Sequence, residues 1–174
     1  MITLRTARPQ DAEAIARVYV ETWRDTYAGL VPDRVLIGMS ERRQTVLWSY
    51  ALRDQQVMVA SAGESGVIGF GSCGAARGVD LPYQGEIFTL YVLPDFQGRG
   101  IGKRLLGALF GMLLRRGMDS ALIWVLADNP ARFFYHAMGG RWTATREEDL
   151  WGAALPEQAY GWSDLRKAIA STGP

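Results

Sequence analysis

A strand, a glycine-rich turn, a helix and a second strand follow one another between residues 86 and 126, and this unit constrains the fold more than any other feature. Residues 86–92, Glu-Ile-Phe-Thr-Leu-Tyr-Val, predict the first strand, and residues 121–126 predict the second. The helix is predicted by an apolar stripe at helical spacing, which consists of Leu105, Leu106, Leu109, Phe110 and Leu113. Because strands joined through a helix almost always form a right-handed parallel pair, we expect these two strands to be parallel.

The residues before this unit predict a strand, two helices and a hairpin. Residues 2–6 alternate between apolar and polar side chains, and residues 11–24 have helical spacing. Ser40 is a suitable N-cap for a second helix that runs to about residue 52. The expected buried stripe of that helix is Val46, Leu47 and Tyr50. Residues 56–62 and 67–76 predict a hairpin, whose second strand contains three glycines that suggest close backbone approach or a bulge: Gly69, Gly71 and Gly74.

The residues after the unit predict a helix and further strands. Asn129 and Pro130 are expected to open the helix, and a pair of glycines at 139–140 to close it. Residues 142–146 predict a strand, residues 150–156 a loop, and residues 158–165 a last strand before a short basic helix. The order of elements predicts a mixed α/β (α+β) fold with six to seven strands in the sheet, and residues 1–174 are expected to form one domain.

The overall charge and the cysteine count narrow the class of protein. The 174 residues carry 19 Lys+Arg and 18 Asp+Glu, so the formal net charge is +1. Such a balance gives no general attraction to nucleic acid or to a membrane surface. Cys73 is the single cysteine, so no intramolecular disulfide can form. With no signal peptide and no apolar run near the length of a bilayer span, the sequence predicts a cytoplasmic protein.

The glycine-rich turn before the central helix has the composition of an anion-binding loop. It consists of Gln97, Gly98, Arg99, Gly100, Ile101, Gly102 and Lys103. Glycines let a ligand approach the backbone, and the first amides of the helix have no intrahelical acceptor, so together they could bind a phosphate or pyrophosphate. The alternative is a turn that only starts a helix. A P-loop would need a glycine at Gln97 and a hydroxyl at Arg104, and a dinucleotide-binding loop would need a glycine at Lys103.

This turn and its flanking residues resemble the acetyl-coenzyme A signature of the GNAT superfamily of N-acetyltransferases. The resemblance rests on Gln97-x-x-Gly100-x-Gly102, preceded by Leu90-Tyr91-Val92 and Pro94. It extends over nearly the whole chain in the order of elements, and it implies the GNAT fold, with helices on both faces of the sheet. It also implies that the amides of residues 97–103 bind the pyrophosphate of acetyl-CoA, and that Leu90 and Val92 pair with pantetheine, with Tyr91 between them.

The resemblance also implies roles for two residues after the second central strand. Asn129 would contact the cofactor arm, and Tyr135, six residues later, would protonate the leaving thiolate as a general acid. Since a thiol has an ordinary pKa of about 8.5 and a tyrosine one of about 10, this proton transfer needs little tuning. From the residues alone, Tyr135 is more simply an aromatic packed in the core, and Asn129 a helix cap.

The sequence says less about which residue acts as general base and which residues bind the acceptor. Glu86 begins the central strand and could act as general base, directly or through water; the alternative is an exposed carboxylate at a strand end. Asp128 is a weaker candidate. Trp23 and Tyr27 are four residues apart and could line the acceptor pocket, or pack the first helix onto the sheet. Aromatic residues in the C-terminal half could close the pocket or form a homodimer contact: Trp124, Trp142, Trp151, Tyr160 and Trp162.

The expected activity is therefore transfer of the acetyl group of acetyl-CoA to an amine of a small molecule or peptide, without a metal. The single histidine, His136, and the single cysteine offer no zinc cluster. Three alternatives remain: an acyl-CoA-binding or sensing domain without catalysis, a nucleotide binder that uses the same loop, and a transferase for longer acyl groups.

Overall fold

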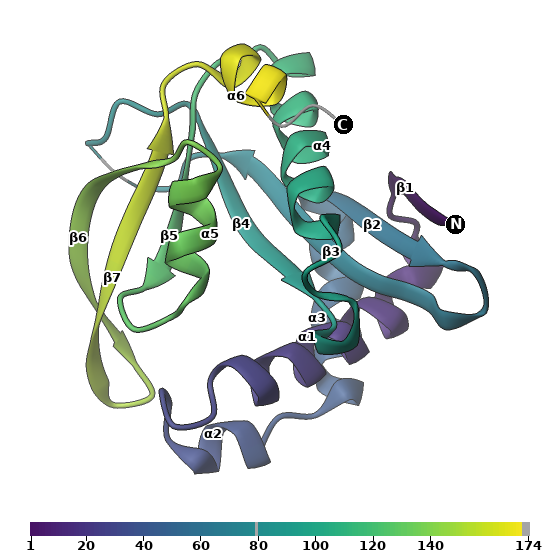
Figure 1. Cartoon of the computed structure of the whole chain (residues 1–174). Coiled ribbons are helices and arrows are strands. Elements are labelled where there is room, and N and C mark those ends of the chain that lie inside the picture. Colours follow the sequence, from purple (N-terminus) through teal and green to yellow (C-terminus); the bar gives the residue numbers. More distant parts are fainter. Residues whose placement is uncertain (79, 172–174) are drawn as a thin grey trace. The chain divides into compact units, whose positions relative to one another are not determined.

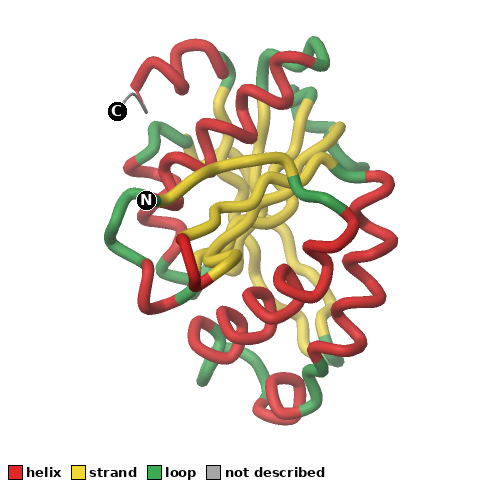
Figure 2. Tube along the Cα trace, turned by 90° about the vertical axis from the view of Figure 1, so that its right-hand side faces the viewer, coloured by secondary structure: helices red, strands yellow, loops and turns green. Residues whose placement is uncertain are grey.

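The computed structural model describes residues 1–78 and 80–171, which form both strands and helices (Figures 1 and 2). The strands are β1 (Ile2–Thr6), β2 (Gln56–Ala62), β3 (Gly66–Ala75), β4 (Gly85–Val92), β5 (Ala121–Leu126), β6 (Arg141–Leu150) and β7 (Ala153–Trp162). The α-helices are α1 (Ala12–Thr26), α2 (Asp33–Ile37), α3 (Glu41–Asp54), α4 (Ile101–Arg115), α5 (Ala131–Ala137) and α6 (Leu165–Ser171).

The strands form one mixed sheet in the order β1-β2-β3-β4-β5-β7-β6. Strand β4 pairs with β5 in parallel, with Gly85 opposite Ala121 and Ile87 opposite Ile123. The β1–β2, β5–β7 and β6–β7 pairs are antiparallel. The predicted mixed α/β sheet and its parallel central pair are therefore confirmed, as are the short first strand and the helix that follows it.

The chain divides into two compact units, and β3, β4 and α4 each contribute residues to both. The first unit comprises Met1–Ser72 and Thr89–Leu109, and the second comprises Cys73–Phe88 and the chain from Phe110 onward. The expectation that the whole chain is one domain stays a prediction.

In the first unit, helices cover both faces of strand β3. The ring of Phe70 contacts the ring of Trp48 on α3, with centroids 4.9 Å apart. The neighbouring glycines face α4: a Cβ added at Gly69 would lie 2.9 Å from the carbonyl oxygen of Tyr91 and 3.4 Å from Leu105. Since real Cβ atoms do not approach a carbonyl oxygen so closely, this position requires glycine, and of the two explanations for these glycines the close backbone approach is confirmed at Gly69.

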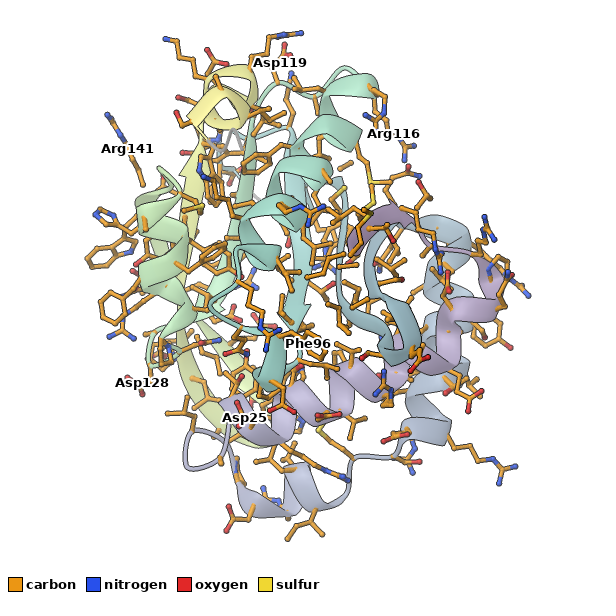
Figure 3. All side chains as sticks on the ribbon, turned by 45° about the vertical axis from the view of Figure 1, so that its right-hand side comes forward. Asp25, Phe96, Arg116, Asp119, Asp128 and Arg141 are labelled. Carbon is orange, nitrogen blue, oxygen red and sulfur yellow. The ribbon has the colours of Figure 1, made fainter. Side chains whose placement is uncertain are left out.

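In the second unit, α4 and α5 pack on strand β7 through aromatic rings. Phe110 contacts Trp162 with centroids 5.0 Å apart, and Tyr135 lies 6.4 Å from the ring of Trp162. Phe110 is fully buried, as the sequence stripe predicts, and Trp162 is nearly so. Beyond the C-terminal end of β7, Arg166 of α6 forms an ion pair at 2.8 Å with Asp119, which lies just before β5 (Figure 3).

The single cysteine belongs to the core. Cys73 on β3 has no exposed surface. Burial raises the pKa of its thiol to about 12, against a smaller opposing effect of Arg116 and Arg115. The thiolate, the reactive form of cysteine, is therefore not populated at neutral pH, and Cys73 is no candidate nucleophile.

The predicted buried stripe of α3 is wrong, although Ser40 caps this helix as expected by accepting a hydrogen bond from the Arg43 amide. Val46, Leu47 and Tyr50 are 52%, 53% and 58% exposed. The buried residue is Trp48, and its helical neighbours at spacings of three and four are half-buried: Gln44, Thr45, Ala51 and Leu52. The face of α3 that carries Trp48 is therefore packed against the protein, and the face that carries Val46, Leu47 and Tyr50 is exposed.

The predicted loop at residues 150–156 is also wrong, because β6 and β7 form a long hairpin there. Its turn consists of Trp151 and Gly152, with φ angles of +56° and +80°. Positive φ at both central residues is the geometry of a type I′ turn, which matches the twist of the strands. Tryptophan is unusual at such a position, and Pro156 is unusual in a strand, so the local sequence predicts a loop. The short helix α2 (Asp33–Ile37) begins directly after Pro32 and was not predicted from the sequence.

None of the helices within the described part of the chain combines the length and the apolarity that crossing a bilayer requires.

Candidate active site

The glycine-rich loop lies in the first unit, between a short 3-10 turn at Pro94–Phe96 and the start of α4 (Figure 3). The Gln97 side chain donates a hydrogen bond to the carbonyl oxygen of Val92 at 3.0 Å, which ties the loop to the end of β4. The Arg99 guanidinium donates to the Asp95 carbonyl oxygen at 3.0 Å and lies over the Phe96 ring. Side chains of the loop thus tie it to the end of β4 and to the turn that precedes it.

Two glycines give this loop a backbone that other residues do not readily adopt. Gly98 and Gly100 have φ angles of +72° and +74°, and a Cβ at either position would meet no atom within 4 Å. The loop residues 97–100 are exposed, whereas Ile101 is buried and anchors the first turn of α4. The amides of that turn have no intrahelical acceptor, and the helix dipole adds positive potential. The space at the two glycines and these amides fit a phosphate or pyrophosphate group.

Strand β4 leads into this loop with its last residues half-buried. Leu90, Tyr91 and Val92 all retain some exposure, in contrast to the buried start of the strand. A Cβ at Gly71 would lie 3.2 Å from Leu90 and 2.6 Å from Leu109, so the Leu90 side chain shares the α4 side of the sheet. Tyr91 packs instead on Phe70 and on Tyr19 of α1, with both ring centroids 5.6 Å away.

The acceptor candidates Trp23 and Tyr27 also lie in the first unit, on and just after α1. Their rings are 4.3 Å apart, and the ring of Tyr19 lies 5.5 Å from Trp23 on the same face. The indole Nε1 of Trp23 donates a hydrogen bond to the Tyr91 hydroxyl at 3.2 Å. Burial raises the pKa of Tyr19 to about 12, with a smaller effect of Tyr27, so its hydroxyl stays protonated.

Tyr19 and Trp48 belong to the same aromatic cluster, although the sequence did not predict either of them as a site residue. Tyr19 lies 6.1 Å from Trp48, which in turn contacts Phe70. The signal for Tyr19 was present, because it precedes Trp23 by four residues and so shares its helical face.

Asn129 and Tyr135 lie in the second unit. The Asn129 side chain is buried, and its Oδ1 accepts a hydrogen bond from the Ala131 amide at 2.9 Å, which ties it to the first residue of α5, whereas the N-cap of this helix is Pro130. Tyr135 on α5 is 5% exposed, with its ring among those of Phe134, Tyr160 and Trp162. The next residue, His136, is exposed, and so is Asp128 (Figure 3). The roles of Asn129 toward the cofactor and of Tyr135 as an acid stay predictions.

Glu86, also in the second unit, is not the exposed carboxylate that one interpretation expected, since it is 5% exposed. Its oxygens accept hydrogen bonds from Arg77: the backbone amide at 3.0 Å, Nε at 3.4 Å and Nη2 at 3.1 Å. The Arg77 guanidinium also lies 4.1 Å above the ring of Phe88. The Arg77 guanidinium compensates the charge of the buried Glu86 carboxylate. The three hydrogen bonds also hold Arg77, which follows β3, against Glu86 of β4.

The tryptophans of the C-terminal half do not form one cluster. Trp162 is buried, Trp142 is 62% exposed, and Trp151 is 37% exposed at its turn. Trp124 lies beneath the guanidinium of Arg146, which also pairs with Glu157 at 2.7 Å. Across residues 1–78 and 80–171, no three histidine, cysteine or acidic side chains are grouped to hold a metal ion.

The geometry of loop, strand and helix agrees with a comparison to protein families, in which residues 13–139 match the acetyltransferase (GNAT) family. The chain belongs to the GNAT acetyltransferase family. The expected GNAT fold and acyltransferase class are thereby confirmed.

Individual GNAT relatives cover nearly the whole chain. The uncharacterized N-acetyltransferase YuaI of Bacillus subtilis is 34% identical over 166 residues, 95% of either chain. The structure of YncA from Salmonella typhimurium, with its cofactor acetyl-CoA, has a TM-score of 0.68 at 24% identity and covers 94% of both chains. PaiA N-acetyltransferase from Thermoplasma acidophilum, in complex with coenzyme A, has a TM-score of 0.65 at 22% identity over 91% of this chain and 98% of that one. These two structures support the same fold.

Proposed function

We propose that this GNAT protein transfers the acetyl group of acetyl-CoA directly to a primary amine of a small molecule or peptide. The observation that carries the proposal is the loop at Gly98 and Gly100, where positive φ angles and open space leave backbone amides accessible at the start of α4. Such a loop suits the pyrophosphate of coenzyme A. The relatives in complex with acetyl-CoA and coenzyme A support this choice of ligand.

In the proposed reaction both substrates are bound together, and the amine attacks the thioester carbon. A carbon–nitrogen bond forms, the carbon–sulfur bond breaks, and the thiolate leaves. Tyr135 would protonate that thiolate, and Glu86 would accept the proton that the amine loses, directly or through water. Leu90 and Val92 would pair with pantetheine through their backbone groups, and Asn129 would contact the cofactor arm. The aromatic face of Trp23 and Tyr27 would attract a cationic amine.

The proposal predicts that the purified protein binds acetyl-CoA with one site per chain and releases free thiol only when a suitable amine is added. Titration calorimetry with acetyl-CoA, and with ATP and NAD as controls, measures the first part. Thiol release across a panel of amines measures the second. Binding of ATP or NAD in preference to acetyl-CoA would contradict the ligand, whereas acetyl-CoA binding without turnover on any amine would favour a sensing domain.

Replacing Glu86 with Gln should lower kcat at least about 100-fold if the carboxylate accepts the proton of the amine. The substitution keeps the size of the side chain and removes its charge. Steady-state rates with a fixed amine, combined with calorimetry of acetyl-CoA binding, provide the measurement.

The matched control is Arg77→Met, which removes the ion pair but leaves the Glu86 carboxylate and its bond from the backbone amide. An equal loss of activity in the two variants would show that Glu86 only anchors the segment at Arg77, and the base would then have to be another group.

A further inference from the structure

The hydrogen bond between Trp23 and Tyr91 joins two parts of the site that the proposed function treats separately. Trp23 belongs to α1, on the acceptor side, and Tyr91 lies between the two residues proposed to pair with pantetheine. The bond is 3.2 Å long from the indole Nε1 to the hydroxyl oxygen. Both partners lie in the first unit.

The contact with Trp23 lies on one face of β4, and the side chains of the two residues proposed to pair with pantetheine lie on the other. Side chains alternate along a strand, so Tyr91 points opposite to Leu90 and Val92. Leu90 and Val92 meet the α4 side, as their closeness to the Cβ positions of Gly71 and Gly69 shows. Tyr91 alone of the three points into the aromatic cluster of α1 and α3, against Tyr19 and Phe70.

The surroundings of Tyr91 restrict its movement further. The carbonyl oxygen of Tyr91 faces Gly69 closely enough that a Cβ there would lie 2.9 Å away. On the side-chain end, rings stand edge-on or tilted against the phenol, and the hydroxyl is held by the indole. The residue is thus fixed at its backbone by β3 and at its hydroxyl by α1.

We propose that Trp23 and Tyr91 are positioning residues, which hold the end of β4 in the orientation that presents the backbone of Leu90 and Val92 to pantetheine. This inference rests on the proposed function, because it assumes that acetyl-CoA is the ligand. It goes further in assigning the Trp23 indole to cofactor binding rather than to acceptor binding alone. It predicts that the bond acts on the pantetheine part of the ligand and not on the pyrophosphate part.

The test compares two ligands on the variants Tyr91→Phe and Trp23→Phe, each of which removes one partner of the bond and keeps a ring. Acetyl-CoA carries pantetheine, whereas 3′-phosphoadenosine 5′-diphosphate has the same nucleotide and pyrophosphate without it. Calorimetry should show acetyl-CoA binding weakened about fivefold in either variant, because binding must then restore the order at the end of β4 that one net hydrogen bond supplies in the unmodified protein, with no further loss in the double variant. The dissociation constant of the nucleotide should be unchanged.

Tyr19→Phe is the matched control, because it removes a hydroxyl from the same cluster without touching the bond. It should bind both ligands as the unmodified protein does. The inference is overturned if Tyr91→Phe binds acetyl-CoA normally, or if it loses both ligands equally, as a general loosening of the unit would cause. Failure of the unmodified protein to bind acetyl-CoA would instead overturn the proposed function, so the two outcomes are distinct.

Discussion

Replacing Tyr135 with Phe should lower kcat by a factor of about 10² to 10⁴ while leaving the affinity for acetyl-CoA unchanged. The substitution removes one hydroxyl from a ring that is 5% exposed and packed against Tyr160 and Trp162, and the phenyl ring that remains keeps those contacts. Without the acid the thiolate must leave unprotonated, so the chemical step slows although the ligand still binds. Thiol release under single-turnover conditions, together with calorimetry, separates the two effects.

Tyr160→Phe is the appropriate control for that experiment. Tyr160 is buried in the same aromatic group, and its hydroxyl donates to the Gln158 side chain at 3.0 Å. We expect this variant to lose about 1 kcal/mol of unfolding free energy through the lost hydrogen bond, with little change in kcat. If both variants behaved alike, losing stability but not turnover, Tyr135 would be a packing residue and the general acid would have to be sought elsewhere.

Replacing Gly100 with Val should raise the dissociation constant for acetyl-CoA about tenfold or more. Gly100 has a φ angle of +74°, and a residue with a Cβ pays about 1–2 kcal/mol in this region, more when it is β-branched. The loop can relieve this strain only by rotating the backbone that precedes α4, which would turn its amides away from the pyrophosphate. Calorimetric titration with acetyl-CoA and with 3′-phosphoadenosine 5′-diphosphate should show the loss for both ligands.

The turn between β6 and β7 supplies the control for this strain. Gly152 has a φ angle of +80° and, like Gly100, no neighbour within 4 Å of its Cβ position. Gly152→Val should therefore lower the free energy of unfolding by a similar amount but leave the affinity for acetyl-CoA unaltered. Equal losses of affinity in the two variants would mean that the glycine loop has no special part in binding.

Much of the fold could be predicted because local pattern and tertiary packing agree. The apolar run of β5 is buried except at the half-buried Trp124, and the stripe of α4, which includes Leu105 and Leu113, is fully buried. The predictions from sequence fail where a contact with a distant residue determines which side chains are buried or which strands pair. On α3 the indole of Trp48 reaches Phe70 and Tyr19, which no periodicity within the helix reveals. At residues 150–156 a cross-strand ladder with β6 overrides the weak strand propensity of Ala153 and Pro156.

The candidate site divides in the same way. The loop at Gly98 and Gly100 could be read from the sequence because positive φ angles demand glycine. The partner of Glu86 could not, because Arg77 lies nine residues earlier and meets it only through the pairing of β3 and β4. The bond from Trp23 to Tyr91 spans 68 residues, and either side chain alone is an ordinary aromatic of the core.

The burial of Cys73 has a practical consequence for every assay of coenzyme A release. Ellman-type disulfide reagents react with accessible thiolates, and this protein offers its single thiol fully buried, with a pKa of about 12. The folded enzyme should therefore consume no reagent, so the absorbance change counts product molecules without subtraction of a protein background. A slow stoichiometric reaction, one thiol per chain, would instead report unfolding of the core around β3, and the same cuvette would then measure stability as well as turnover.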